Sequence, residues 1–105
     1  MSYSIDLQKI ADELDFDLED IEMLMEVFME STQESMDLLK IAIDNNNLDE
    51  IFKSAHAIKG SSANLTLMDI SNIAKEIEHE ARESNNINYL ERYEILNNMI
   101  SKLQI

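Results

Sequence analysis

The chain contains no proline and a single glycine, so few residues in it interrupt a helix. Its apolar residues recur at the spacing of one helix face over most of the length. The breaks between these segments are short polar clusters of Asn, Asp and Ser. These features predict an all-α fold.

Five helices are expected, joined by short connections. A short first helix runs from about Ser4 to Leu14, and the Asp15 to Asp17 segment offers a cap for a long second helix to about Ile43. The third runs from about Leu48 to Leu65, a fourth ends near Glu83, and a fifth completes the chain. Each of the last three is preceded by a candidate N-cap with an acid three residues later: Asn47 with Glu50, Thr66 with Asp69, and Asn88 with Glu91.

Short connections favour antiparallel neighbours, so the expected architecture is an antiparallel four-helix bundle with the first helix packed on it as a cap. The residues expected to face inward are, by helix, Ile5, Ile10 and Leu14; Ile21, Leu24, Met25, Phe28, Thr32, Met36, Leu39 and Ile43; Ile51, Ala55, Ile58, Ser62 and Leu65; Ile70, Ile73, Ala74, Ile77 and Ala81; and Leu90, Ile95, Leu96, Met99, Ile100 and Leu103.

A length of 105 residues fits one domain, residues 1–105, and a monomer is the simplest expectation for four helices that close one core. The chain has no cysteine, no signal-peptide pattern and no apolar run long enough for a membrane span, so a cytoplasmic location is expected. A net charge of -14 argues against nucleic acid and anionic membranes as partners. The class of partner that this charge does not argue against is other proteins.

Gly60 lies inside the third predicted helix, where glycine costs roughly 1 kcal/mol relative to alanine. His56 is four residues earlier, and at about 100° per residue it points about 140° away from the apolar stripe, towards water. A bare backbone beside an exposed imidazole suggests a histidine that a bulky partner must reach.

The neighbours of His56 suit a phosphoryl group. An imidazole is nucleophilic near neutral pH, and Lys59, one turn away, can neutralise the charge of a phosphoryl group that it carries. Lys53 flanks the histidine on the other side, and Phe52 and Ala63 could anchor a partner. Phe52 could equally pack beneath the first helix.

The segment His56-Ala57-Ile58-Lys59-Gly60-Ser61-Ser62-Ala63-Asn64-Leu65 resembles the signature of histidine-containing phosphotransfer (HPt) domains, and the helix order agrees along nearly the whole chain. The resemblance implies that His56 is phosphorylated, that Lys59 neutralises the phosphate and that Gly60 gives clearance to a receiver domain. It also implies that Glu78 hydrogen-bonds the imidazole nitrogen that is not phosphorylated. Thr66, where the family usually has glycine, is expected to cap the next helix, and Ala57 replaces a residue that is often polar.

Other functions fit less well. A di-iron site needs two inward Glu-x-x-His motifs, whereas this chain has one, Glu76 to His79, which faces outward. A single glycine leaves no glycine-rich nucleotide cradle, so the chain is not expected to be an enzyme that phosphorylates itself. A helical adaptor without chemistry remains an alternative.

The sequence therefore predicts a phosphocarrier of a two-component phosphorelay, with no metal or cofactor of its own. By the resemblance, its partners are a sensor histidine kinase and response-regulator receiver domains, and the receivers bring Mg²⁺. The alternative within the family is the phosphotransfer domain of a larger hybrid or chemotaxis-type histidine kinase.

Overall fold

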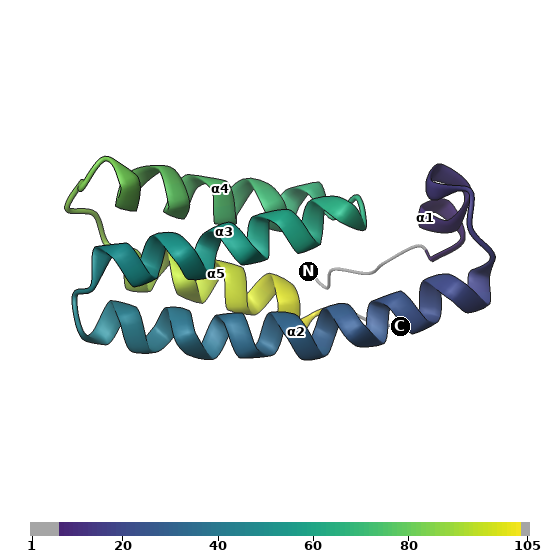
Figure 1. The fold of residues 1–105 in the computed structure, drawn as a ribbon, viewed down its shortest axis with the longest axis horizontal. Coiled ribbons are helices and arrows are strands. Elements are labelled where there is room, and N and C mark those ends of the chain that lie inside the picture. The colour runs from purple at the N-terminus through teal and green to yellow at the C-terminus, as the bar shows by residue number, and fades with distance from the viewer. Residues whose placement is uncertain (1–6, 104–105) are drawn as a thin grey trace.

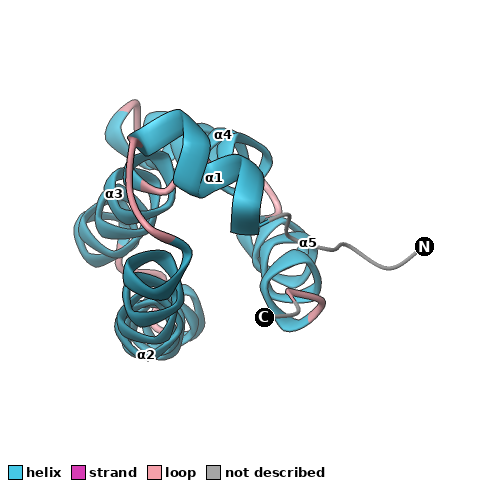
Figure 2. Cartoon of the chain, turned by 90° about the vertical axis from the view of Figure 1, so that its right-hand side faces the viewer, coloured by secondary structure: helices cyan, strands magenta, loops and turns pink. Residues whose placement is uncertain are grey.

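The computed structural model describes residues 7–103, which form helices and short connections. The helices are α1 (Leu7–Leu14), α2 (Leu18–Asp44), α3 (Leu48–Asn64), α4 (Met68–Arg82) and α5 (Tyr89–Ser101). Helices α2 to α5 form an antiparallel bundle in which each packs on the next and α5 returns to α2 (Figures 1 and 2). The all-α, four-helix architecture is therefore confirmed.

Helix α2 is the longest and projects beyond the other three (Figure 1), and α1 lies across that end of the bundle (Figure 2). Ile10 and Ala11 of α1 are buried, so α1 is the expected capping helix. The predicted start at Ser4 and the inward residue Ile5 lie outside the described residues. None of the described helices combines the length and apolar character needed to cross a membrane.

The core follows the predicted stripes, with three corrections. Leu24, Leu90 and Ile95 are 39%, 41% and 38% exposed. At about 100° per residue, Leu24 lies about 70° from the centre of the buried stripe of α2, and the two α5 residues lie about 110° from theirs, so no neighbouring helix covers them. Tyr89 is buried in α5 instead.

Four described helices end in the same way. Asp15, Asn46, Thr66 and Ser84 have positive φ, and the amide of the next residue reaches back five positions to a helix carbonyl, as in Leu67 N to Ser62 O at 2.9 Å. This is the Schellman arrangement, in which glycine is the favoured residue at the positive-φ position. The chain makes all four turns without glycine.

The N-caps agree with the sequence at two of three sites. The Asn47 and Asn88 side-chain oxygens accept from the amides of Glu50 at 3.2 Å and Glu91 at 3.0 Å. The prediction for Thr66 is wrong, because Thr66 closes the end of α3 with a φ of 60° and Leu67 is the N-cap residue of α4. Asp17 is the N-cap residue of α2 but makes no side-chain capping bond.

Thr66→Gly should raise the free energy of unfolding by about 0.5–1 kcal/mol, because it removes the left-handed strain of a β-branched residue. Urea unfolding of both proteins measures the change. Thr66→Ala is the control, since alanine keeps the Cβ that causes the strain. An equal gain in the alanine variant would contradict this explanation.

Candidate functional site

His56 lies in the middle of α3 with a side chain that is 61% exposed. Its neighbours Ala55 and Ile58 are fully buried, so α3 is held by one face and presents the imidazole on the other. The ring of Phe52, one turn earlier, stacks on the imidazole with a centroid separation of 5.9 Å and an interplanar angle of 17°. The two rings are therefore nearly parallel neighbours.

Glu78 on α4 bridges the two predicted site residues of α3. Its Oε1 lies 3.0 Å from Nδ1 of His56, and its Oε2 lies 2.7 Å from Nζ of Lys59. The Glu78 side chain is only 7% exposed. The structure therefore brings His56, Lys59 and Glu78 together, although 22 residues separate the histidine from the glutamate.

The Glu78 carboxyl is held in its ionised form. Burial by itself would raise its pKa, but the hydrogen bonds and charges of Lys59 and His56 outweigh burial and lower the pKa from the ordinary value of 4.5. A carboxylate can only accept hydrogen bonds, so Nδ1 of His56 must carry the proton. In the neutral imidazole, Nε2 is then the unprotonated, nucleophilic nitrogen.

The two lysines that flank His56 in sequence have different environments. Lys59 is 31% exposed and bonds Glu78. Lys53 is 62% exposed and pairs with Asp49 at 3.3 Å and Glu50 at 3.6 Å on its own helix. The hydrogen bond to Asp49 and the charges of both acids raise the pKa of Lys53. Only Lys59 belongs to the hydrogen-bonded group around His56.

Gly60 is exposed, and because it has no side chain, no atoms project from this position beside His56. A Cβ built on Gly60 would meet no atom within 4 Å, and its φ is not positive. The free domain therefore does not need glycine at this position. Ala63, one turn further, is also exposed.

Phe52 does not pack beneath the first helix. It lines a hollow with Leu48, Ala81 and Arg82, where α3 begins and α4 ends, whereas α1 lies by the opposite end of these helices (Figure 1). Its half-buried ring packs against the core from outside and stacks on His56. The alternative that Phe52 packs beneath the first helix is therefore wrong, and Phe52 lies at the site beside His56.

A hydrogen bond that the sequence analysis did not identify joins α3 to α4 beside the site. Ser71 Oγ donates to the backbone carbonyl of Lys59 at 3.0 Å, and Ser71 is 4% exposed. Ser71 lies seven residues before Glu78 and shares its helix face, a spacing that could have indicated it.

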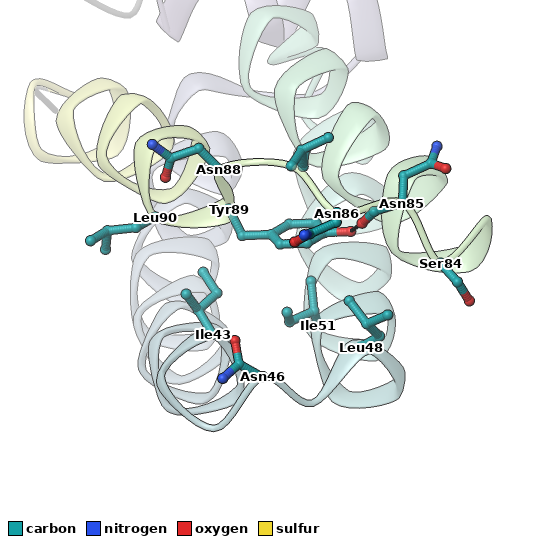
Figure 3. A pocket seen from close by; sticks show the side chains of 11 residues that line it. Ile43, Asn46, Leu48, Ile51, Ser84, Asn85, Asn86, Asn88, Tyr89 and Leu90 are labelled. Atoms are coloured by element: carbon teal, nitrogen blue, oxygen red, sulfur yellow. Dashed lines mark hydrogen bonds between the residues drawn. The ribbon is translucent and has the colours of Figure 1, made fainter.

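Another pocket lies away from His56. It opens where the α4–α5 connection crosses the end of α2 and α3, and the Tyr89 ring lies across it while its hydroxyl donates to Asn85 O at 2.6 Å (Figure 3). Its lining residues are Ile43, Asn46, Leu48, Ile51, Ser84, Asn85, Asn86, Ile87, Asn88, Tyr89 and Leu90. His56 is not among them.

The remaining histidine, His79, is exposed on α4, and Glu76 pairs with Arg92 of α5 at 2.7 Å. Within residues 7–103, no three His, Cys, Asp or Glu side chains come together as a metal site would require.

Glu78→Gln should lower the free energy of unfolding by about 1 kcal/mol near neutral pH, since it removes the charge that binds Lys59. A pKa lowered in the folded state gives stability that is present above the unfolded value and is lost as the pH falls through the folded value. The difference between wild type and Glu78→Gln should therefore shrink below pH 4.5.

Urea unfolding at a series of pH values checks this, with the same pair compared in a His56→Gln background so that the imidazole does not titrate. A difference that stayed constant into acid would mean that Glu78 is not ionised through these contacts.

Comparison with known proteins gave two matches. Over an alignment of 70 positions, which covers 59% of this chain and 8% of the relative's length, the chain is 43% identical to the Chemotaxis protein CheA of Borreliella burgdorferi. No solved structure gave a significant match. The family model for the Hpt domain matches residues 23–105. With the helical bundle and the resemblance around His56, this match shows that the chain belongs to the Hpt domain family, the histidine phosphotransfer domains.

Proposed function

We propose that this chain is a histidine phosphocarrier of a two-component phosphorelay, with Nε2 of His56 as the atom that carries the phosphoryl group. The observation that carries the proposal is the 3.0 Å contact of Nδ1 with an ionised, buried carboxylate on the next helix. It leaves the other ring nitrogen nucleophilic, on a side chain that is 61% exposed.

In the accepting step, the Nε2 lone pair attacks the phosphorus of an aspartyl phosphate on a receiver domain or of a nucleotide on a kinase. The bond from phosphorus to the leaving oxygen breaks as the nitrogen–phosphorus bond forms. The ring keeps its Nδ1 proton and becomes cationic, and Glu78 stabilises that charge. Donation to another receiver's aspartate is the same step in reverse.

Lys59 is the cation for the phosphoryl oxygens. Its ammonium has three donors and lies one helical turn from His56, so it can contact the phosphoryl group while remaining near Glu78. Lys53 forms ion pairs with Asp49 and Glu50, and it lies at the edge of the surface on which the partner docks.

The receiver docks on the exposed face of α3, where Phe52, Gly60 and Ala63 surround His56. The chain needs no cofactor for this step, because the receiver supplies Mg²⁺ and the carboxylates that bind it. We propose a cytoplasmic monomer with a sensor kinase and receivers as its partners.

The match to a protein named for chemotaxis favours a second candidate, in which the same histidine accepts phosphoryl from a chemotaxis-type kinase. The two candidates share the chemistry of His56 and differ in the donor. Incubation with a kinase ATP-binding domain plus labelled ATP, or with receiver domains charged with labelled phosphate, separates them by which donor transfers label.

His56→Gln should abolish labelling by phosphoramidate and by charged receivers, because it removes the nucleophile, while a mostly exposed side chain contributes little to stability. His79→Gln is the matched control, an exposed histidine on the neighbouring helix, and should label like wild type. Acid-labile, alkali-stable label identifies phosphohistidine. Label on the His56→Gln protein would overturn the assignment.

Gly60→Ala should stabilise the domain by about 1 kcal/mol, since the new Cβ meets no atom and alanine is the better helix former. Gly60→Gln should keep at least wild-type stability but lose affinity for receivers and transfer rate, because a long side chain obstructs His56. Unfolding and transfer are measured on the same samples. Wild-type transfer by Gly60→Gln would show that clearance is not the reason for the glycine.

Lys59→Ala should slow phosphoryl acceptance about tenfold or more, since it removes the cation nearest to the phosphoryl oxygens. Lys53→Ala removes the same charge from a side chain paired with Asp49 and Glu50, and should have a much smaller effect. Initial rates of labelling provide the comparison. Equal rates for the two variants would assign the effect to overall charge.

A further inference from the structure

The hydrogen bond of Ser71 crosses from α4 to the turn of α3 that carries the site. Its acceptor is the carbonyl of Lys59, three residues after His56. Ser71 is 4% exposed, so the donor side of the contact is shielded from water. Among the described residues, the side-chain contacts between α3 and α4 that are polar involve this hydroxyl and Glu78.

These two polar residues act at different points of one helix pair. Ser71 and Glu78 are seven residues apart on α4 and share a face, with Ala74 between them and Ala81 beyond Glu78, both buried. The small side chains let α4 approach α3 closely. The hydroxyl then sets where α4 sits along α3, because its hydrogen bond has one acceptor and a narrow range of length.

The position of α4 along α3 decides whether Glu78 can serve both of its partners. Its two oxygens reach Nδ1 of His56 at 3.0 Å and Nζ of Lys59 at 2.7 Å at the same time. A slide of about 1 Å would lengthen one contact past hydrogen-bonding range. The tautomer of His56 therefore depends on the register between the two helices.

We propose that Ser71 is a positioning residue for the phosphotransfer site, which fixes α4 against the Lys59 carbonyl so that Glu78 holds the His56 imidazole in its Nδ1–H tautomer. The consequence for transfer rate rests on the function proposed above. The effect on the tautomer does not.

Ser62 provides a matched control. It is also buried, and its hydroxyl contacts the same Lys59 carbonyl at 3.2 Å and the Ile58 carbonyl at 2.6 Å. Both acceptors belong to its own helix, so the hydroxyl of Ser62 does not join α3 to α4. Replacing either serine with alanine removes one buried hydroxyl near Lys59, and only the Ser71 change removes a link between helices.

The first test reads the imidazole nitrogen chemical shifts of His56 by NMR in wild type, Ser71→Ala and Ser62→Ala, above the pH at which the ring is protonated. The Nε2–H tautomer should rise several-fold in Ser71→Ala and stay at its wild-type level in Ser62→Ala. Thermal unfolding of both variants shows that the domain remains folded. A wild-type tautomer ratio in Ser71→Ala would overturn the proposal, whatever happens to its stability.

The second test measures labelling by phosphoramidate. Ser71→Ala should slow it about tenfold in the wild-type background. In a Glu78→Gln background the same change should have no further effect, since Ser71 acts through the Glu78 carboxylate. Independent, multiplicative effects would overturn the proposal. Absence of labelling in every protein, with the tautomer shift observed, would refute the phosphocarrier function and leave the positioning role standing.

Discussion

The close packing of α3 against α4 is the constraint on which the site depends. Both helices carry small buried side chains: Ala55 and Ser62 on α3, and Ser71, Ala74 and Ala81 on α4. Small side chains keep the helix axes near one another, and this proximity lets a glutamate reach both a histidine and a lysine of the neighbouring helix. A bulkier residue at these positions would separate the helices and leave the Glu78 carboxylate buried without its partners, at a cost of several kcal/mol.

Glu78 also stands apart from the other acids of this very acidic chain. Among the described residues it is the acidic side chain that is buried, while the others lie at the surface, where water solvates them. Burial makes its charge useful, because electrostatic interactions are stronger away from water. The same carboxylate orients the imidazole, balances Lys59 and can stabilise the positive charge that develops on the ring during transfer.

The position of the single glycine is explained by function and not by the needs of the fold. Four helix ends adopt positive φ with Asp15, Asn46, Thr66 and Ser84, where glycine would relieve strain, yet none of them has it. The one glycine is Gly60, in a regular helix beside His56, where a Cβ would meet nothing. Glycine is therefore absent from the helix ends where it would relieve backbone strain. It is present at a position where its only advantage is clearance for an approaching molecule.

The sequence by itself determined the helices and the part of the site that lies on one of them. Apolar spacing and polar breaks are local signals, so the five helices could be predicted from them. The arrangement of His56, Lys59 and Gly60 could also be predicted, because all three lie within a few turns of α3.

The exposure of Leu24, Leu90 and Ile95 could not be predicted, because coverage of a helix flank depends on where its neighbours lie. Thr66 was misassigned because a helix end and the next helix start overlap there, and a cap pattern does not reveal φ. The family resemblance implied the contact of Glu78 with His56, but only the tertiary structure decided that the same carboxylate also meets Lys59 and that Ser71 binds the Lys59 carbonyl. Those contacts join two helices, and their geometry is set by interaxial packing, which no spacing along the chain specifies.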